Sequence, residues 1–599
     1  MKAYLNGQEY AFEEGETILQ LARRAGVFIP TLCRFEPLSH KPATCRVCLV
    51  EVSDGAGTRM VASCETPLAD GMRIDTLSRH VRDMQRTQVE MIFADHDQEC
   101  VSCARHGDCE LQDLGEAVGL TRNRFTHRLR PTAAERPLDD SAAGMTRDMS
   151  KCIRCLRCVE VCRQIQGVAA LTVDGQGLGT CIGVGMADDH SASACIQCGQ
   201  CTLVCPTGAL AERDQNDLVL DMLADPEVTT VFSFAPSVRV LLGEEFGFAP
   251  GVNVEGKIVG ALRRIGADVV LDTDFAADVT IMEEGTELLG RLKKGAKGPM
   301  FTSCCPGWIN YAEKHCPGVL PHISSTRSPQ AILGALAKSY LPEAMGLEKE
   351  RLRTVSIMPC VAKKDEAARP ELARADVPDT DVVLTVREFA RLLRRMGVDL
   401  AAVEPEPFDN PFMSASTGAA VIFGSTGGVM EAAVRTVYAV VTGKELEHIE
   451  VTPLRGMDGV REAVIDLGEG NGSIRVAICH GLRNARALAE QAIAGESPYD
   501  FIEVMACPGG CVDGGGTSRV KGDYHPHART RQQGLYSLDR AMPRRQSHKN
   551  PQVKKLYEDF LGEPNSHKAH ELLHTAYSDR SESPSETIFA NKQRLTLTD

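Results

Sequence analysis

The chain has 599 residues, of which 43% are hydrophobic and 25% charged, so it is long enough for several globular domains. It carries 66 basic and 81 acidic residues, a net charge of −15, which argues against a nucleic-acid-binding protein because a polyanion would repel it. It has no stretch of about eighteen uncharged apolar residues that could span a membrane, and no apolar signal core or twin-arginine motif near Met1, so we expect a cytoplasmic protein.

Cysteine is the most informative residue type, with 23 copies. Sixteen of them lie before residue 206, mostly in C-x2-C groups, and residues 206–303 contain none. In a long chain without a secretory signal, such a distribution favours metal binding over disulfide formation.

The first cysteine group follows a short mixed segment. MKAYLNGQEYAF predicts an alternating strand and ETILQLARRAG a short helix. Cys33, Cys45, Cys48 and Cys64 then follow with the spacing C-x11-C-x2-C-x15-C. The strands, helix and ligand-bearing loop resemble the plant-type ferredoxin fold, and the spacing resembles the 2Fe–2S domains of large oxidoreductases. A zinc site or unliganded thiols are the alternatives.

The second group is HDQECVSCARHGDC, which contains His96, Cys100, Cys103 and Cys109. One imidazole and three thiolates at H-x3-C-x2-C-x5-C can hold one 4Fe–4S cubane or one tetrahedral zinc ion, and zinc stays an open alternative. The spacing resembles the His-ligated 4Fe–4S module of complex I and its relatives.

Two further groups, KCIRCLRCVEVC and ACIQCGQCTLVCP, repeat the spacing C-x2-C-x2-C-x3-C. This is the pattern of bacterial two-cluster ferredoxins, in which the fourth cysteine of each run ligates the other cluster. One 4Fe–4S cluster is therefore expected on Cys152, Cys155, Cys158 and Cys205. The other is expected on Cys195, Cys198, Cys201 and Cys162. Two zinc ribbons fit such tightly packed cysteines less well.

After residue 210 the pattern becomes that of an α/β domain. VTTVFSFAP, ADVVLDT, RTVSIMPC and IRVAICHG predict buried strands, and KIVGALRRIG, VREFARLLRRMG and ALAEQAIAG predict helices, so we expect parallel βαβ units. No G-x-G-x-x-G follows a strand and no G-x4-G-K-[ST] occurs, so no nucleotide site of those types is predicted. The glycines of GAAVIFGSTGGVMEAA suggest close packing at a strand–helix turn.

Three motifs in this half are TSCCPGW (302–308), MPCVAKK (358–364) and MACPGGCVDGGG (505–516). Together they closely resemble the signatures of the iron-only FeFe-hydrogenases, and the resemblance extends over nearly the whole chain. It implies an H-cluster, a 4Fe–4S cubane joined to a di-iron subsite with CO, CN and dithiolate ligands. The cubane ligands implied are Cys305, Cys360, Cys507 and Cys511, of which Cys511 bridges to the subsite.

The same resemblance implies a proton path from the site. Cys304 corresponds to the family's free thiol beside the open coordination position, and a thiol with a pKa near ~8.5 can carry protons at neutral pH. The path implied runs through Cys304, Glu287, Ser324 and Glu284, with Arg291 near its outer end. Taken alone, MEEGTE fits an ordinary solvated helix face, and Gly285 would weaken the helix.

The family's cyanide contacts correspond to Lys363, Pro236 and Ser237, since an ammonium group and backbone or hydroxyl donors suit metal-bound anions. Met358 and Met505 would form a soft apolar lining, or could be ordinary core residues. The chain departs from the family after GGG, where it has TSR instead of the common QP, which affects packing near Gly516.

We therefore expect a multidomain α/β and α+β protein whose C-terminal segment resembles the family's small subunit. The expected domains are a 2Fe–2S β-grasp domain (1–79), a His/Cys3 4Fe–4S module (80–125), a two-cluster ferredoxin-like domain (140–210), an H-cluster catalytic domain (211–520), the small-subunit-like helical segment (521–578) and a tail (579–599).

The resemblance implies reversible interconversion of H2 with protons and electrons. The expected cofactors are one 2Fe–2S cluster, three accessory 4Fe–4S clusters and the H-cluster, which requires maturation proteins. The electron partner would be ferredoxin or flavin-containing NAD(P)-reactive subunits, including those of an electron-bifurcating complex. A non-catalytic electron-transfer subunit would lack the three motifs, and a hydrogen sensor tends to lose the proton-path thiol or glutamates.

Overall fold

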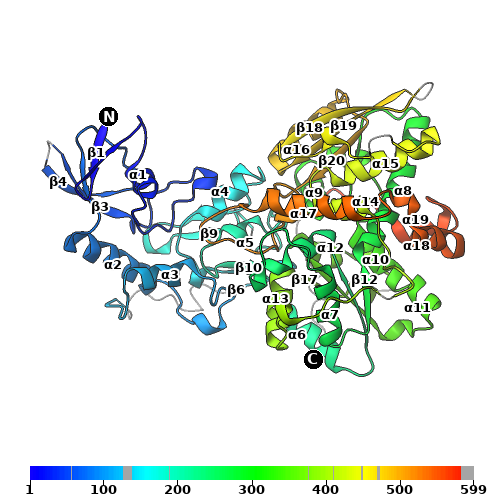
Figure 1. Cartoon of the computed structure of the whole chain (residues 1–599), viewed down its shortest axis with the longest axis horizontal. Coiled ribbons are helices and arrows are strands. Elements are labelled where there is room, and N and C mark those ends of the chain that lie inside the picture. The colour runs from blue at the N-terminus through cyan, green and yellow to red at the C-terminus, as the bar shows by residue number, and fades with distance from the viewer. Residues whose placement is uncertain are drawn as a thin grey trace.

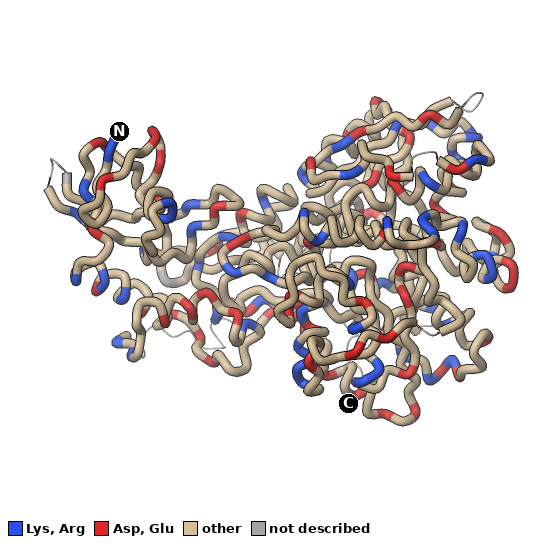
Figure 2. Tube along the Cα trace, in the orientation of Figure 1, with Lys and Arg blue, Asp and Glu red and all other residues tan. Residues whose placement is uncertain are grey.

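The computed structural model describes residues 1–54, 57–125, 138–187, 189–374, 377–408, 410–446, 449–468 and 472–581. Figure 1 shows an elongated molecule, with the N-terminal domain at one end and the large C-terminal half at the other. Beyond Ser581, the predicted tail lies outside the described residues. No helix in the described ranges is long and apolar enough to cross a membrane. Figure 2 shows basic and acidic residues interspersed along the trace.

A five-stranded sheet in the order β2-β1-β5-β3-β4 forms the N-terminal domain. Its strands are β1 (Lys2–Leu5), β2 (Gln8–Ala11), β3 (Leu49–Asp54), β4 (Gly57–Ala62) and β5 (Arg73–Asp75). The predicted alternating segment folds as the β1–β2 hairpin, because Asn6 and Gly7 take the positive φ angles that a type I′ turn requires. Helix α1 (Ile18–Arg24) begins at a capping box of Thr17 and Gln20 and packs its apolar face into the core of this domain.

Short helices and loops carry the next cysteine groups. The loop with the second group lies between α2 (Arg79–Ala94) and α3 (Glu110–Ala117). The third cysteine of each repeated run lies in a short helix, α4 (Arg157–Gln164) or α5 (Gln200–Val204), and these two helices pack together. The strands of this part are β6 (Leu138–Asp139), β7 (Met145–Asp148) and β10 (Leu210–Glu212) in one sheet and the hairpin β8 (Thr172–Asp174) and β9 (Cys181–Gly183).

Two largely parallel sheets form the frame of the C-terminal half. The first has the order β12-β11-β14-β17 and the second β13-β20-β19-β18, in which only β18 runs antiparallel. Their strands are β11 (Thr229–Phe234), β12 (Val269–Asp272), β13 (Met300–Phe301), β14 (Leu352–Met358), β17 (Val382–Thr385), β18 (Val460–Asp466), β19 (Ser473–His480) and β20 (Phe501–Met505), and β15 (Ala373–Arg374) pairs separately with β16 (Val377–Pro378). The predicted strands and parallel βαβ pattern are confirmed.

Helices pack around these sheets. They are α6 (Asn216–Ala224), α7 (Glu255–Arg264), α8 (Thr273–Lys293), α9 (Pro306–His315), α10 (Pro329–Ala337), α11 (Tyr340–Met345), α12 (Ala362–Ala367), α13 (Val386–Arg395), α14 (Gly418–Val421), α15 (Gly428–Thr442) and α16 (Leu482–Ala494). Helix α8 belongs to two hydrophobic cores: its Val279 packs in the core that contains Val231 of β11, and its Ile281 in the core that contains Val476 of β19. This helix therefore spans the space between the sheets.

The C-terminal segment covers the part of the chain that contains the two sheets, and it is helical, as predicted from its sequence. Figure 1 shows α17 (Ala528–Ala541), α18 (Pro551–Leu556) and α19 (His567–Leu573) lying over this part, in orange to red. Asp539 of α17 is fully buried and accepts hydrogen bonds from Arg435 of α15 at 2.9 and 3.0 Å and from Arg545 at 2.6 and 3.0 Å. Arg455 donates to the same carboxylate at 3.2 Å. This carboxylate therefore binds α17 to α15 and to the loop that carries Arg455.

Replacing Asp539 with asparagine is expected to lower the free energy of unfolding by about 3 kcal/mol at pH 7, because buried guanidinium groups lose their counter-charge. Burial alone would raise the pKa of Asp539, but Arg545 and Arg435 lower it to about 2. A lowered carboxyl pKa means that the stabilisation is complete above pH 3.8 and is lost as the pH falls towards 2. Urea unfolding checks this prediction, with the exposed Asp559→Asn as control. Equal effects of the two substitutions would contradict it.

Candidate active site

Four loops that follow parallel strands meet between the two sheets. Pro236 follows β11, Cys360 follows β14, Cys305 follows β13 and Cys507 follows β20. All four line one cavity of about 700 Å³. Parallel strands present the loops after their carboxyl ends at the same sheet edge, so two such edges bring together segments that are far apart in sequence.

The cavity is mostly apolar, and its polar lining consists of its thiols, Lys363, Thr273 and Gln330. Its cysteines are Cys304, Cys305, Cys360, Cys507 and Cys511. Met358 and Met505 line it as well, and their side chains are almost fully buried. The structure thus brings every residue predicted to ligate the H-cluster to one enclosed place from which apolar side chains exclude water.

Two observations show that the cavity suits a metal cluster. Burial raises the pKa of Cys360 to about 12 and also raises those of Cys305 and Cys507, so these thiols stay neutral unless a cationic centre holds them as thiolates. Ser237 Oγ, beside the cavity, and Gln330 Oε1, of a residue lining it, are buried without a hydrogen-bond partner among the described residues. Such unsatisfied groups at a cavity are typical of a site that binds a further group.

Lys363 enters the cavity from α12. Its Nζ donates to Ser328 Oγ at 2.7 Å, to Glu366 Oε2 at 2.8 Å and to the carbonyl oxygen of Cys304 at 3.3 Å. Burial favours the neutral amine, but Glu366 more than offsets this and raises the pKa of Lys363, which keeps it charged. Glu366 and Ser328 were not predicted from the sequence, although the three-residue spacing of Lys363 and Glu366 in AKKDE is a usual helical pairing.

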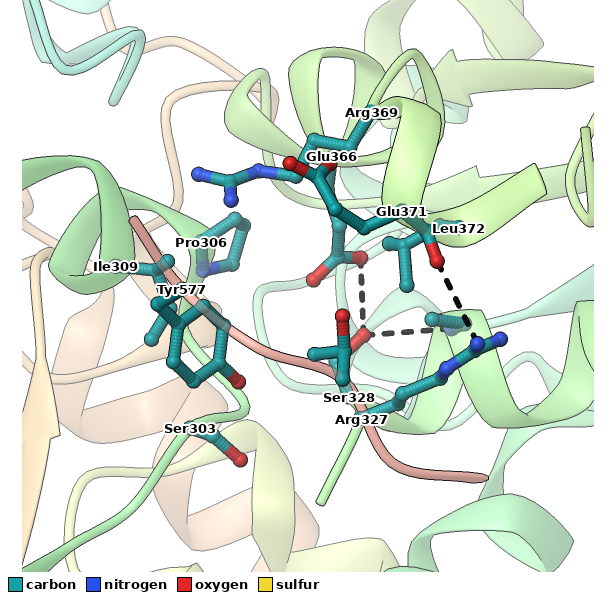
Figure 3. Close-up of a pocket in the computed structure, with 12 residues that line it drawn as sticks. Ser303, Pro306, Ile309, Arg327, Ser328, Glu366, Arg369, Glu371, Leu372 and Tyr577 are labelled. Carbon is teal, nitrogen blue, oxygen red and sulfur yellow. Dashed lines mark hydrogen bonds between the residues drawn. The ribbon is translucent and has the colours of Figure 1, made fainter. Parts of the chain in front are cut away.

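A second cavity of about 360 Å³, with polar and charged side chains among apolar ones, lies beside these partners of the lysine. Ser303, Ser328, Glu366, Arg369 and Tyr577 line it, and Figure 3 shows Tyr577 near Ser303 at the side of the pocket opposite Arg327. Burial raises the pKa of Tyr577, so its hydroxyl stays neutral. Glu366 and Ser328 therefore link Lys363 of the large cavity to a second cavity, to whose lining the C-terminal segment contributes Thr575 and Tyr577.

The predicted proton-path residues lie between Cys304 and the far end of α8. Glu284 is fully buried; burial, with a smaller contribution from the charge of Glu287, raises its pKa to about 8. Ser324 interacts with Glu284 and donates its hydroxyl to Glu287 Oε2 at 2.8 Å. Arg291 is half-buried and lies on α8 about two turns after Glu284. It donates to the Pro321 carbonyl oxygen at 3.4 Å.

The expected order of the two glutamates was wrong. Cys304 is electrostatically coupled to Glu284, whose Oε1 accepts the backbone N–H of Ser303 at 3.3 Å, whereas Glu287 contacts Ser324 and Ser325. The direction of α8 explains this, because the helix leaves the protein interior as it proceeds towards Lys293. Gly285 does not interrupt this helix.

The two repeated cysteine runs line two separate cavities in the crossed grouping that the sequence predicts. The first cavity is lined by Cys152, Cys155, Cys158 and Cys205. The second is lined by Cys162, Cys195, Cys198 and Cys201. Each cavity is otherwise largely apolar, which suits a cubane surrounded by four thiolates.

In the His/Cys group, His96 is buried and its Nδ1 has no hydrogen-bond partner within the described chain. Burial lowers the pKa of His96 to about 4, which leaves the neutral imidazole that a metal ligand requires. The Cys103 and Cys100 thiols act electrostatically on Cys109, so the three lie near one another.

The thiols of the first group interact in pairs. Cys33 contacts Cys45, and Cys48 contacts Cys64. The charge of Cys33 also acts on Cys48, so the two pairs lie close together. This arrangement gathers all four predicted ligands of the 2Fe–2S cluster in one part of the N-terminal domain.

Contacts between the cysteine groups show which of them are neighbours in space. The second run adjoins the large cavity, because a Cβ added at Gly307 would lie 3.8 Å from Cys198 Cβ and 4.0 Å from Cys305 Sγ. The first run contacts the N-terminal domain, where His40 Nε2 lies 2.9 Å from the carbonyl oxygen of Cys155.

The structure also shows how two further segments pack, the glycine-rich segment GAAVIFGSTGGVMEAA and the TSR segment after Gly516. GAAVIFGSTGGVMEAA packs closely, as predicted, but the predicted strand before its turn is a helix. The turn joins α14 to α15, and its Phe423 and Gly424 line the large cavity.

The TSR segment begins after Gly516. Thr517 Oγ1 donates to the Gly514 carbonyl oxygen at 2.9 Å. Arg519 pairs with Asp108 and Glu110 and donates to the Leu203 carbonyl oxygen at 3.0 Å. TSR thus joins the catalytic half to the cysteine-rich domains.

Comparison with family models gives five matches along the chain. They are a 2Fe-2S iron-sulfur cluster binding domain (1–79), the NADH-ubiquinone oxidoreductase-G iron-sulfur binding region (85–124), a 4Fe-4S dicluster domain (151–209), the iron only hydrogenase large subunit, C-terminal domain (228–515) and the iron hydrogenase small subunit (526–580).

Similar proteins match over almost their whole length. NADP-reducing hydrogenase subunit HndD of Solidesulfovibrio fructosivorans is 44% identical over 587 residues, which cover 96% of this chain and 98% of that protein. Iron hydrogenase 1 of Clostridium pasteurianum is 37% identical over 96% of this chain and 99% of its own. A solved structure of FeFe-hydrogenase HydA1 from Chlamydomonas reinhardtii is 40% identical, with a TM-score of 0.55, over 61% of this chain and 99% of that one. The chain therefore belongs to the iron-only FeFe-hydrogenase family and combines its catalytic domain with ferredoxin-like iron–sulfur domains.

Proposed function

We propose that this protein interconverts H2 with protons and electrons at an H-cluster held by Cys305, Cys360, Cys507 and Cys511. The observation that carries the proposal is a fifth thiol, Cys304, in the same cavity, followed by a line of proton-carrying side chains. An electron-transfer subunit needs neither feature, whereas heterolytic chemistry on H2 needs a proton acceptor beside the metal. When bound, the H-cluster supplies the metal centre at which H2 is split or formed.

The residues of the chain then have distinct tasks. Cys304 takes up or delivers the proton at the cavity, and Glu284, Ser324 and Glu287 pass it along α8. A raised pKa of about 8 lets Glu284 hold a proton at neutral pH and still release it. Lys363 places its ammonium group where it can stabilise anionic ligands of the cluster, and Met358 and Met505 exclude water.

For the electrons, we propose the route set by the contacts between cysteine groups. The cluster of the second run exchanges electrons with the H-cluster, and the cluster of the first run connects to the N-terminal domain. The similarity to an NADP-reducing hydrogenase subunit favours NAD(P)-reactive flavin subunits as the final partner. Ferredoxin and electron bifurcation are the alternative acceptor arrangements.

Infrared spectroscopy of anaerobically purified protein, produced with maturation proteins, tests the proposed function. We expect sharp CO and CN bands that shift when H2 is added. Absence of the bands, with maturation shown to work on a control hydrogenase, would leave an electron-transfer role. Bands without appreciable H2 turnover would indicate a sensor.

A further inference from the structure

A buried polar cluster lies beside the proton relay, outside the direct route from Cys304 to Glu287. Glu283 of α8 is fully buried, and His574, just after α19, is almost so. Tyr557 donates its hydroxyl to Glu283 Oε1, and the backbone N–H of Asn565 donates to Glu283 Oε2 at 2.8 Å. Two titratable groups are therefore enclosed where the C-terminal segment meets α8.

Hydrogen bonds connect this cluster to the relay. The backbone N–H of Ser325 donates to Glu287 at 3.1 Å, and its hydroxyl lies 3.4 Å from Glu287 Oε2 and 2.9 Å from His574 Nδ1. His574 Nε2 lies 3.1 Å from Glu283 Oε2. When Nε2 carries the proton towards Glu283, Nδ1 is left as an acceptor for the Ser325 hydroxyl.

The surroundings keep the imidazole in place. Arg327 donates to the His574 carbonyl oxygen at 2.9 Å, and Thr575 N–H donates to the Ser325 carbonyl oxygen at 2.8 Å. The exposed ring of His570 stacks on His574 with a centroid distance of 4.4 Å. In the part of the chain that the structure describes, the charged or titratable groups in contact with His574 are Glu283 at Nε2, His570 on the ring and Arg327 at the carbonyl oxygen. Glu287 reaches the imidazole through Ser325.

We propose that Ser325, His574 and Glu283 form a side branch of the relay that stores one proton. A neutral Glu287 gives its proton to Ser325 Oγ as the hydroxyl proton moves to His574 Nδ1, and His574 Nε2 releases a proton to Glu283. One proton passes from Glu287 to Glu283, no electron moves, and the reverse steps return it. His574 acts through Glu287 and is a positioning residue.

Storage of a proton on this branch is useful only if the protein converts H2, so the inference rests on the proposed function. Each H2 yields two protons, while the direct route from Glu284 through Ser324 to Glu287 is a single line. A branch that ends at an enclosed carboxylate can hold one proton while the other leaves. The C-terminal segment supplies its imidazole, His574, which gives that segment a task beyond packing.

A cycle of Ser325→Ala, His574→Gln and the double variant tests the branch in the loaded enzyme. We expect about a fivefold loss of viologen-linked H2 oxidation for each single variant, well below the roughly 100-fold loss expected for a group on the direct route. The double variant should lose no more than either single variant, because both interrupt one branch. His567→Gln, at an exposed histidine that begins the same helix, is the matched control and should change nothing. If the fold-losses of the two single variants multiply in the double variant, the proposal is overturned.

A second readout uses protein without the di-iron subsite, so that a failure of the proposed function cannot mask the answer. Infrared difference spectra between the wild-type chain and Glu283→Gln should contain a band of the Glu283 carboxyl group that His574→Gln shifts, with His567→Gln as control. If no band depends on Glu283, or if His574→Gln only lowers the melting temperature, His574 merely clamps α19 to α8 and the proposal fails. Metal CO and CN bands in the loaded enzyme report separately on the proposed function.

Discussion

Replacing Cys304 with alanine should slow H2 turnover at least about 100-fold, the usual range for loss of a group that transfers the proton at the reacting centre. Cys304 is the cavity thiol not assigned to cluster ligation, and it is electrostatically coupled to Glu284. Removing its sulfur leaves the predicted ligands in place. We therefore expect unchanged CO and CN bands, and the turnover is measured as viologen-linked H2 evolution and uptake.

Cys316→Ala is the matched control for this experiment. Cys316 ends α9, the helix that begins directly after Cys305, and its half-buried thiol lies outside the cavity. It should retain full turnover. A Cys304→Ala enzyme that keeps more than a tenth of its activity at full loading would show that the proton leaves by another group.

The second large effect concerns the crossed cluster ligands. Cys205→Ala should remove the 4Fe–4S cluster of Cys152, Cys155 and Cys158, because these four residues line one cavity. The chain should lose about four irons, and turnover with a protein electron acceptor should fall far more than turnover with a small dye. Iron analysis and electron paramagnetic resonance measure the loss, with Cys181→Ala, outside both cavities, as control.

The double variant Cys205→Ala with Cys198→Ala distinguishes crossed from uncrossed ligation. Cys198 lines the other cavity, so crossed ligation predicts the loss of two clusters, about eight irons. If Cys205 instead completed the cluster of its own run, both substitutions would damage one cluster and only about four irons would be lost.

The sequence allowed prediction where spacing or periodicity is local. Buried strands such as β11 and β14 are short apolar runs, and cysteines three residues apart define a cluster loop by themselves. Nothing local indicates that Ser325 would meet His574, 249 residues later, because only the packing of the C-terminal segment brings them together. The order of Glu284 and Glu287 also depends on the direction in which α8 leaves the interior, which no motif records.

The contacts of Arg519 affect how such proteins can be shortened or recombined. Its guanidinium is buried between catalytic and accessory domains, where Asp108 and Glu110 neutralise it and the Leu203 carbonyl oxygen accepts one N–H. Deleting the accessory domains would expose a charge and a loop fitted to an absent neighbour. The accessory domains are distinct in sequence, but Arg519 packs against them in the structure. An exchange of accessory domains between relatives therefore requires that Arg519 be exchanged as well.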